Sequence, residues 1–365
     1  MASRLRVAKS TSQLLSANIQ IVMAAKCSYI DRTGKTVIDA SRYESACGFS
    51  EGLAPVMDSR KGWGFIDRTG AFVIQPQFES ALCFSDGLAA VLLHDRWGFI
   101  DKNGALVIDY QFEWVAEFSE GVAVVQRSLK PAQPRTISLA DLQTARLTTI
   151  TEVWDLTDTR NYEAQEQGEF LLIDTVGKIL MVFDPKKVEV DIDFATFSQG
   201  LLCAYSPEKD AMGFVDKSGE FVIPATFSAA APFSEGLARV AVIEDDMEKF
   251  AFIDKNGNLV IPPTFNTDFD FRRNSSGFSE GLAAVSEGLN PTQTEESKFV
   301  YIDRTGKIVF ATEFFYAGEF RDGLAVVYND ETDRWGFIDT TGKVVIPVQY
   351  PAANDFSEGL ALVSI

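Results

Sequence analysis

The feature that most constrains the fold is a hexamer that occurs eight times along the chain. It consists of an aromatic or aliphatic residue, an aliphatic residue, Asp, two variable residues and Gly, as in FIDRTG or FIDKNG. Neighbouring copies start roughly 36 residues apart, apart from one gap of about two periods. The aspartates of the eight copies are Asp31, Asp67, Asp101, Asp174, Asp216, Asp254, Asp303 and Asp339.

A second motif, Phe-Ser-Glu-Gly-Leu-Ala or a close variant, lies between successive hexamers and once after the last. Its copies begin at Phe49, Phe84, Phe118, Phe197, Phe233, Phe278, Phe320 and Phe356. Two motifs in a fixed order, eight times over, indicate a tandem repeat protein. Repeats with a period of 20 to 50 residues are typical of solenoids and propellers.

Both motifs predict turns between short strands. Asp at the first position of a type I turn accepts hydrogen bonds from the turn backbone, and Gly at the fourth adopts the positive φ that closes a hairpin. The Ser-Glu-Gly part of the second motif predicts another turn, followed by a strand. We therefore expect each repeat to be a three-stranded meander: the Gly-Leu-Ala strand, the strand entering the Asp turn, and the strand leaving it, which several prolines would end (Pro76, Pro224 and Pro347).

The strand entering the Asp turn is apolar on both faces, so neighbouring repeats must cover it. This predicts an all-β fold in which eight tandem β-meander units stack as an elongated, curved β-solenoid-like array. The alternative is a closed eight-bladed β-propeller, which the final Gly-Leu-Ala strand at 359–363 would suit. Three strands per unit and unequal repeat lengths favour the solenoid over the propeller.

The repeats divide the chain into four parts. Residues 1–26 form a lead and a first strand, with the strand at Ile19 to Ala25, and residues 27–125 hold repeats one to three. Residues 126–168 are an insertion or a decayed repeat, and residues 169–365 hold repeats four to eight. The lead is basic and rich in serine, a composition that targeting segments share. We expect a cytoplasmic protein, with targeting by the lead left open.

The string Trp-Gly-Phe-Ile-Asp at Trp63, Trp97 and Trp335, together with the second motif, resembles the WG-repeat family, which is widespread in bacteria. The resemblance extends from about residue 27 to the end, apart from residues 126–168. Five of the eight repeats lack the Trp, and four of these also lack the Gly. The resemblance implies no catalytic residues and no general activity.

No pattern of catalytic or metal-ligating residues stands out. His94 is the only histidine and lies in a polar turn, so we interpret it as a solvated loop residue. Cys27, Cys47, Cys83 and Cys203 include no CxxC pair and are interpreted as small buried residues. The eight aspartates are too far apart for a calcium-binding β-roll and are interpreted as turn residues. We therefore predict no enzyme, no metal and no cofactor.

The remaining candidates for binding are the three tryptophans and the charged surface. Trp63, Trp97 and Trp335 occupy equivalent positions in their repeats. They could form a shared aromatic platform for a sugar or a quaternary amine. Alternatively, each packs over a neighbouring strand, with the Gly that follows it leaving space for the ring. The formal charge of −19 makes nucleic acid an improbable partner. No segment has the apolar length of a membrane-spanning helix. We predict a non-catalytic scaffold for protein–protein interaction; the alternative is an envelope or carbohydrate-binding module.

Overall fold

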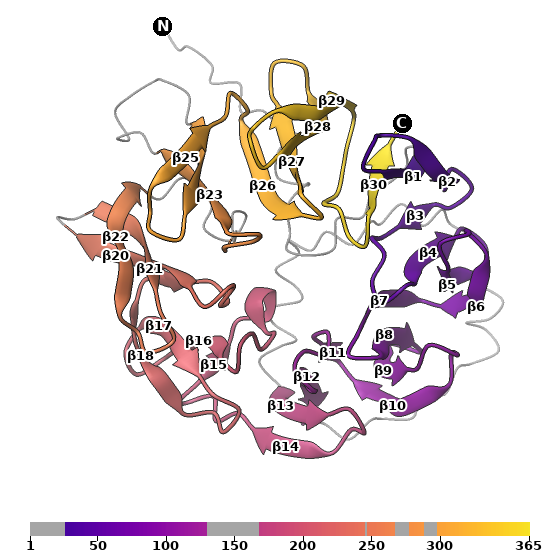
Figure 1. Ribbon diagram of the computed structural model, residues 1–365. Coiled ribbons are helices and arrows are strands. Elements are labelled where there is room, and N and C mark those ends of the chain that lie inside the picture. Colours follow the sequence, from indigo (N-terminus) through magenta and orange to yellow (C-terminus); the bar gives the residue numbers. More distant parts are fainter. Residues whose placement is uncertain (1–25, 130–167, 245–246, 267–276, 288–297) are drawn as a thin grey trace, which may run out of the picture.

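The computed structural model describes residues 26–129, 168–244, 247–266, 277–287 and 298–365. These residues form thirty strands in eight antiparallel sheets, together with one 3-10 turn, η1 (Ile192–Phe194). Figure 1 shows the sheets arranged as blades around a common axis. No helix in the described part of the chain is long and apolar enough to cross a membrane.

The blades are numbered along the chain, and their strands are given from the axis outward (Figure 1). Blade 1 contains β30 (Leu360–Ser364), β1 (Cys27–Asp31) and β2 (Thr36–Asp39). Blade 2 contains β3 (Ser45–Ala46), β4 (Ala54–Asp58), β5 (Gly62–Ile66) and β6 (Phe72–Phe78). Blade 3 contains β7 (Ser80–Ser85), β8 (Leu88–Leu93), β9 (Arg96–Ile100) and β10 (Leu106–Phe112). Blade 4 contains β11 (Trp114–Val115), β12 (Val122–Ser128), β13 (Gly168–Asp174) and β14 (Ile179–Val182).

The second half of the ring repeats this order. Blade 5 contains β15 (Glu189–Val190), β16 (Leu202–Ser206), β17 (Ala211–Val215) and β18 (Phe221–Phe227). Blade 6 contains β19 (Ala229–Ala230), β20 (Ala238–Glu244), β21 (Met247–Ile253) and β22 (Leu259–Asn266). Blade 7 contains β23 (Leu282–Glu287), β24 (Lys298–Asp303) and β25 (Ile308–Ala311). Blade 8 contains β26 (Tyr316–Arg321), β27 (Leu324–Asn329), β28 (Arg334–Asp339) and β29 (Val344–Tyr350).

Blade 1 is built from both ends of the described chain. The last strand, β30, pairs antiparallel with β1 over five residues, from Cys27 opposite Ser364 to Asp31 opposite Leu360. The amide of Ile365 then donates a hydrogen bond to the carbonyl of Lys26, at 2.7 Å. Because this pairing closes the ring, the expected open solenoid-like array is wrong. The eight-bladed propeller, given as the alternative, is the fold.

The solenoid was favoured because the innermost strand of a blade leaves little trace in the sequence. In blades 2, 4, 5 and 6 that strand is only two residues long, too short for an alternating pattern. The unequal repeat lengths also have a local origin. Strands β12 and β13 pair as far as Ser128 opposite Gly168, so the segment between them joins two neighbouring strands of blade 4. An insertion there lengthens one repeat without breaking the ring.

At the N-terminus, residues 19–25 lie outside the described part of the chain. The inner side of β1, where a Gly-Leu-Ala strand lies in the other blades, is taken by β30. The strand that completes the first repeat therefore comes from the end of the chain.

The prolines expected to end the third strand lie inside it. Pro76, Pro224 and Pro347 are within β6, β18 and β29. Each of these strands is the outermost of its blade, where an amide that faces solvent has no ladder partner. The expected ends were therefore wrong, and the strands continue for two or three residues past each proline.

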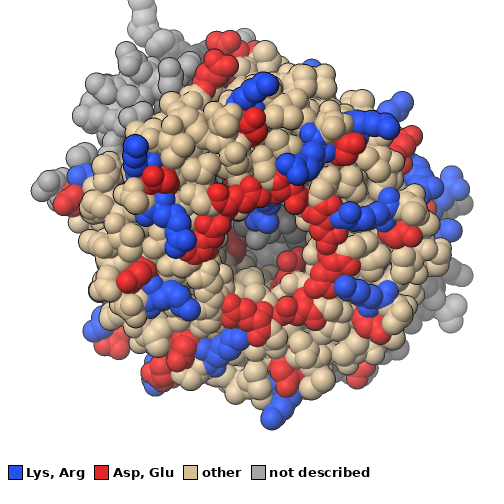
Figure 2. All heavy atoms as spheres, viewed as in Figure 1, with Lys and Arg blue, Asp and Glu red and all other residues tan. Residues whose placement is uncertain are grey.

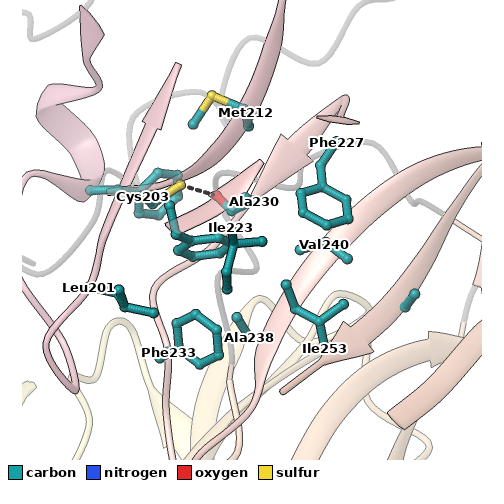
Figure 3. Close-up of a cluster of buried hydrophobic side chains, with 13 residues drawn as sticks. Leu201, Cys203, Met212, Ile223, Phe227, Ala230, Phe233, Ala238, Val240 and Ile253 are labelled. Carbon is teal, nitrogen blue, oxygen red and sulfur yellow. Dashed lines mark hydrogen bonds between the residues drawn. The ribbon is translucent and has the colours of Figure 1, made fainter. Parts of the chain in front are cut away.

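The core lies mainly between blades. In seven of the eight hexamers the first residue is aromatic and packs on the Phe of the next blade's second motif, with ring centroids 4.8 to 5.1 Å apart; the eighth begins with Leu172. Figure 3 shows one such interface, where Met212 and Ile223 of blade 5 share a cluster with Ala238 and Ile253 of blade 6. Neighbouring blades thus cover the apolar strands that a single meander would expose.

Candidate functional site

The Asp turns are held together by the aspartate side chains. Oδ1 of Asp31 accepts hydrogen bonds from the amides of Thr33 and Lys35, at 2.9 and 3.1 Å, and Gly34 has a φ of 82°. The hydroxyl and amide of Thr33 lower the pKa of this carboxyl, since both donate to its charged form. The other seven aspartates accept the same pair of backbone bonds.

The serine of the second motif fastens each blade to the next. In seven of the eight copies its hydroxyl donates to the carbonyl of the motif's Phe in the following blade, at 2.5 to 2.7 Å. The eighth copy has Arg321 in place of serine. Its guanidinium donates instead to Glu319 of the same strand, at 3.1 Å. The junction of blades 8 and 1 therefore lacks this clamp.

The residue before the Gly of the second motif, acidic in seven copies and Gln199 in the eighth, forms a closed ring of contacts around the axis. In every blade this residue has a positive φ, and its side chain accepts a hydrogen bond from the Gly amide of the following blade's motif, at 2.7 to 3.2 Å. We call these eight residues the collar: Glu51, Asp86, Glu120, Gln199, Glu235, Glu280, Asp322 and Glu358. Figure 2 shows the resulting acidic rim around the central opening.

Basic residues of the Asp turns surround the collar (Figure 2). The Nζ of Lys102 lies 3.0 Å from Glu51, and Arg68 pairs with Glu358 at 3.1 Å. Each cation belongs to the blade that follows its carboxylate, so the pair joins two blades. Asp86 and Glu280 form no ion pair with any described residue, because the following turns have Thr175 and Thr340 at the basic position. These carboxylates belong to blades 3 and 7, which are opposite each other in a ring of eight.

A second group of carboxyls lies one residue before the motif's Phe. Burial raises the pKa of Glu117 to about 7, and that of Asp355 to about 6. Glu319 accepts a hydrogen bond from the amide of Gly277 in the preceding blade, at 3.2 Å. Oδ1 of Asp355 is buried without a hydrogen-bond partner. These groups make the ring asymmetric, since five blades carry no carboxyl at this position.

The three tryptophans lie in separate blades, and the structure does not bring them together. Trp63 and Trp335 are only 6% and 5% exposed, and Trp97 is partly buried. In the other five blades the same slot is occupied by smaller or differently shaped residues: Cys27, Phe170, Met212, Phe250 and Phe299. Burial of Trp63 and Trp335 leaves little of their ring faces for a ligand.

The other sequence candidates lie apart from the collar. His94 is exposed in a turn with a φ of 54°. The four cysteines are free thiols, of which Cys83 alone is partly exposed. Within the described ranges, no group of three or more His, Cys, Asp or Glu side chains is placed to hold a metal ion.

Sequence reasoning missed the collar. It assigned the Ser-Glu-Gly segment to a turn and gave the acidic side chain no partner. The available signal was the recurrence of Glu, Asp or Gln directly before the Gly in all eight copies. A turn alone does not require a hydrogen-bond acceptor at that position.

Eight blades, a ring closed by the last strand and a collar of contacts around one channel mouth define an eight-bladed β-propeller. The WG containing repeat family matches seven segments: residues 28–61, 63–96, 97–127, 212–242, 250–288, 301–332 and 335–365. These segments make up more than half of the chain, so the protein belongs to the WG containing repeat family. No curated protein matches the chain.

Several solved structures are similar in fold. Dipeptidyl peptidase 4 of Porphyromonas gingivalis has a TM-score of 0.51 at 8% identity, covering 92% of this chain and 58% of its own. A prolyl endopeptidase structure has a TM-score of 0.47 at 11% identity, covering 88% of this chain. The chain spans about half (48%) of that endopeptidase's length. TolB from Acinetobacter baumannii has a TM-score of 0.33 at 10% identity and covers 80% of this chain and 64% of its own. At such identities the likeness concerns the fold alone.

Proposed function

We propose that the protein is a non-catalytic propeller scaffold that binds another protein at the face carrying the collar. The observation that supports this proposal is the pair of collar carboxylates, Asp86 and Glu280, without a cation. The other collar contacts also join neighbouring blades. Three of their carboxylates, Glu51, Glu120 and Glu358, pair with a Lys or Arg, and Arg304 donates to the backbone carbonyl of Glu235. Asp86 and Glu280 are exposed, and among the described residues each accepts a hydrogen bond only from a Gly amide, so they retain capacity for an outside partner.

The chemistry of the rim favours a partner that presents basic residues. A ring of like charges around an opening raises the local concentration of oppositely charged groups and speeds association at low salt. Two Lys or Arg side chains of a partner, spaced to reach opposite sides of the mouth, would complete the pattern of ion pairs. We expect binding that weakens as the ionic strength rises.

The test compares two double variants in a pull-down from the native lysate. Asp86→Asn with Glu280→Gln keeps the Gly hydrogen bonds but removes both free charges. The control, Glu208→Gln with Lys209→Gln, neutralises an exposed pair away from the collar. We expect the wild type and the control variant to retain a partner protein from the lysate, and the collar variant not to retain it. Equal retention by all three proteins would contradict the proposal.

Carbohydrate binding is a second candidate. The observation in its favour is that Trp97 and Trp114, in the neighbouring blades 3 and 4, are both partly exposed. Aromatic faces of this kind stack on sugar rings. Quenching of tryptophan fluorescence by an oligosaccharide, lost in Trp97→Phe, would support it. An unchanged spectrum across a panel of cell-wall oligosaccharides would exclude this role for the two residues.

A further inference from the structure

The outer edge of blade 4 differs from the outer edges of most other blades. Outermost strands expose unpaired backbone groups, and proteins protect such edges with proline or charge. The outer strands β6, β18, β22 and β29 contain proline, and β2 and β10 contain aspartate. The sequence of β14 is Ile-Leu-Met-Val, with neither. Among the described strands, only β25 in blade 7 shares this feature.

The exposed side of β14 is both apolar and able to form hydrogen bonds. Leu180 and Val182 are 47% and 50% exposed, and Val176 in the adjoining turn is 73% exposed. The amide of Phe183 donates to Phe170 on the inner neighbour, at 2.9 Å. Because amides alternate sides along an antiparallel strand, the amide of Val182 points away from the sheet. The edge therefore offers a backbone donor beside two apolar side chains.

A pocket continues from the end of β14. It measures about 160 Å³ and lies between the end of β14, the loop that follows it and the Asp turn of blade 5. Its lining includes apolar Met181, Val182 and Val188 and the charged residues Asp184, Lys187 and Glu220. An edge strand that leads into a pocket is the arrangement by which sheets bind extended peptides. Main-chain hydrogen bonds give affinity, and a pocket for one side chain gives specificity.

Charge distinguishes this edge from the comparable edge of blade 7. Residues 176–188 contain three lysines, Lys178, Lys186 and Lys187, and one acid, Asp184. All three lysines are exposed, and none forms an ion pair with a described residue. The corresponding segment of blade 7, residues 305–317, contains one lysine and one glutamate. In a chain with a formal charge of −19, residues 176–188 carry a net positive charge, three lysines against one aspartate, while Glu220 of blade 5 adds one negative charge at the pocket.

We propose that the edge of β14 is a docking site for an extended strand of a partner protein that carries acidic residues at its ends. The docked strand adds to blade 4 as a fifth strand and places one side chain in the pocket. Its apolar residues cover Leu180 and Val182, and its acidic ends lie beside Lys178 on one side and Lys186 and Lys187 on the other. This surface is separate from the collar, which lies at the mouth of the channel.

The experiment selects ligands for the intact protein from a display library of random peptides. We expect enriched peptides to alternate β-branched and polar residues and to carry Asp or Glu near both ends. A synthetic peptide of the enriched sequence is then titrated by fluorescence anisotropy. The double variant Leu180→Lys, Val182→Lys should weaken binding by at least about tenfold, because it places charge on the edge. Lys186→Glu with Lys187→Glu should weaken binding by about threefold and reduce its dependence on salt.

Blade 7 provides the matched control. Val309, at 50% exposed, is equivalent to Leu180, so Val309→Lys with Ala311→Lys makes the same change on an edge that has Phe315 and Tyr316 in place of Lys186 and Lys187. This variant, and the collar variant Asp86→Asn with Glu280→Gln, should bind the peptide as the wild type does. The proposal is overturned if no peptide is enriched, or if both edge variants bind equally well. It is also overturned if sedimentation shows that the wild type self-associates through β14, since the occupant is then a second copy.

Discussion

The blades fall into two kinds that differ at one residue of the strand entering the Asp turn. In blades 2, 3, 5 and 8 this residue is Gly, as at Gly64, and the outer strand opposite it bulges. Trp63 pairs with Phe78 and Phe65 with Ile74, so Gly64 alone lies opposite three residues. In blades 1, 4 and 7 the residue is Ser28, Leu171 or Val300, and the outer strand pairs residue by residue at this position, with a register shift only next to the Asp turn. We call the first kind bulged and the second regular.

The reason for the difference is steric. A Cβ built on Gly64 would lie 2.7 Å from the carbonyl oxygen of Ile74 and 2.7 Å from the nitrogen of Pro76. Side chains larger than Ala stand at this position in the regular blades, and the outer strand of each regular blade ends after four residues. Blade 6 marks the boundary, because Ala251 retains the bulge, so the neighbouring backbone accommodates a single Cβ there. The size of the residue at the Gly position of the WG motif thus decides the shape of the outer edge.

The first prediction concerns the residue before this Gly, and its effect should be the largest. Trp335→Ala should lower the free energy of unfolding by about 4 kcal/mol, because it empties a slot that is almost completely buried. The equivalent residue of a regular blade is Cys27, and Cys27→Ala should cost about 1 kcal/mol, since few atoms are removed. Urea unfolding monitored by circular dichroism measures both. If both variants lost a similar free energy of unfolding, Trp335 and Cys27 would not be filling the same slot to different extents.

The second prediction tests the steric rule itself. Gly64→Val should destabilise the protein by about 3 kcal/mol, because the branched side chain meets the backbone of the outer strand. Gly64→Ala is the control and should cost about 1 kcal/mol, because blade 6 accommodates Ala at this position. Thermal unfolding in a calorimeter distinguishes the two. If the valine variant were as stable as the alanine variant, the bulge would not depend on the lack of a large side chain at position 64.

The third prediction concerns a hydrogen bond found in two regular blades. The hydroxyls of Tyr29 and Tyr301 donate to the carbonyls of Cys47 and Gly318, each at 2.7 Å. Tyr301→Phe should cost about 1 to 2 kcal/mol, because it leaves a buried carbonyl without its donor. Tyr205→Phe removes an exposed bond to Asp210 and should cost less than about 0.5 kcal/mol. Denaturation midpoints that shift equally in the two variants would contradict this ranking.

The smallest predicted effect is a dependence on pH, from two carboxyls that both belong to regular blades. The pKa of Glu117 is raised to about 7 and that of Asp355 to about 6, in each case mainly by burial. A folded state with a raised carboxyl pKa holds the proton more tightly than the unfolded state does, so stability falls as the pH rises from about 4 to about 7.

Glu117→Gln should flatten this fall by about 1 kcal/mol, a value that allows for partial exposure of the side chain. The control is Asp67→Asn, at an Asp turn where hydrogen bonds lower the pKa of the carboxyl. The stability that Asp67 contributes is present above about pH 4 and is lost as the pH falls further. The two variants should therefore change opposite ends of the pH profile. An unchanged slope between pH 5 and pH 7 in Glu117→Gln would refute the assignment.

Much of this architecture follows from the sequence. The recurring hexamer and second motif predicted all-β repeats, eight in number, and the resemblance to the WG-repeat family is confirmed. The solenoid was wrong because closure depends on a pairing between β1 and β30, whose residues are separated by almost the whole chain. No local pattern in either strand specifies that partner. Two-residue strands such as β3 also escape any periodicity argument.

The collar and the β14 edge were beyond sequence reasoning for different reasons. The collar residues recur in every copy, but their partner is a backbone amide of the next blade, and a backbone amide has no signature in the sequence. The edge of β14 is recognised only by contrast with the other outer strands, which requires knowing which strand of each blade is outermost. Both features therefore needed the three-dimensional arrangement.

The pairing of β30 with β1 has a consequence for synthesis of the protein. A ribosome synthesises β1 long before β30, so the ring of a growing chain stays open until β30 has been made. A chain truncated before β30 leaves the inner edge of β1 exposed, an edge that quality-control proteases and chaperones can recognise. Closure of the ring therefore separates chains that contain β30 from chains that stop short of it.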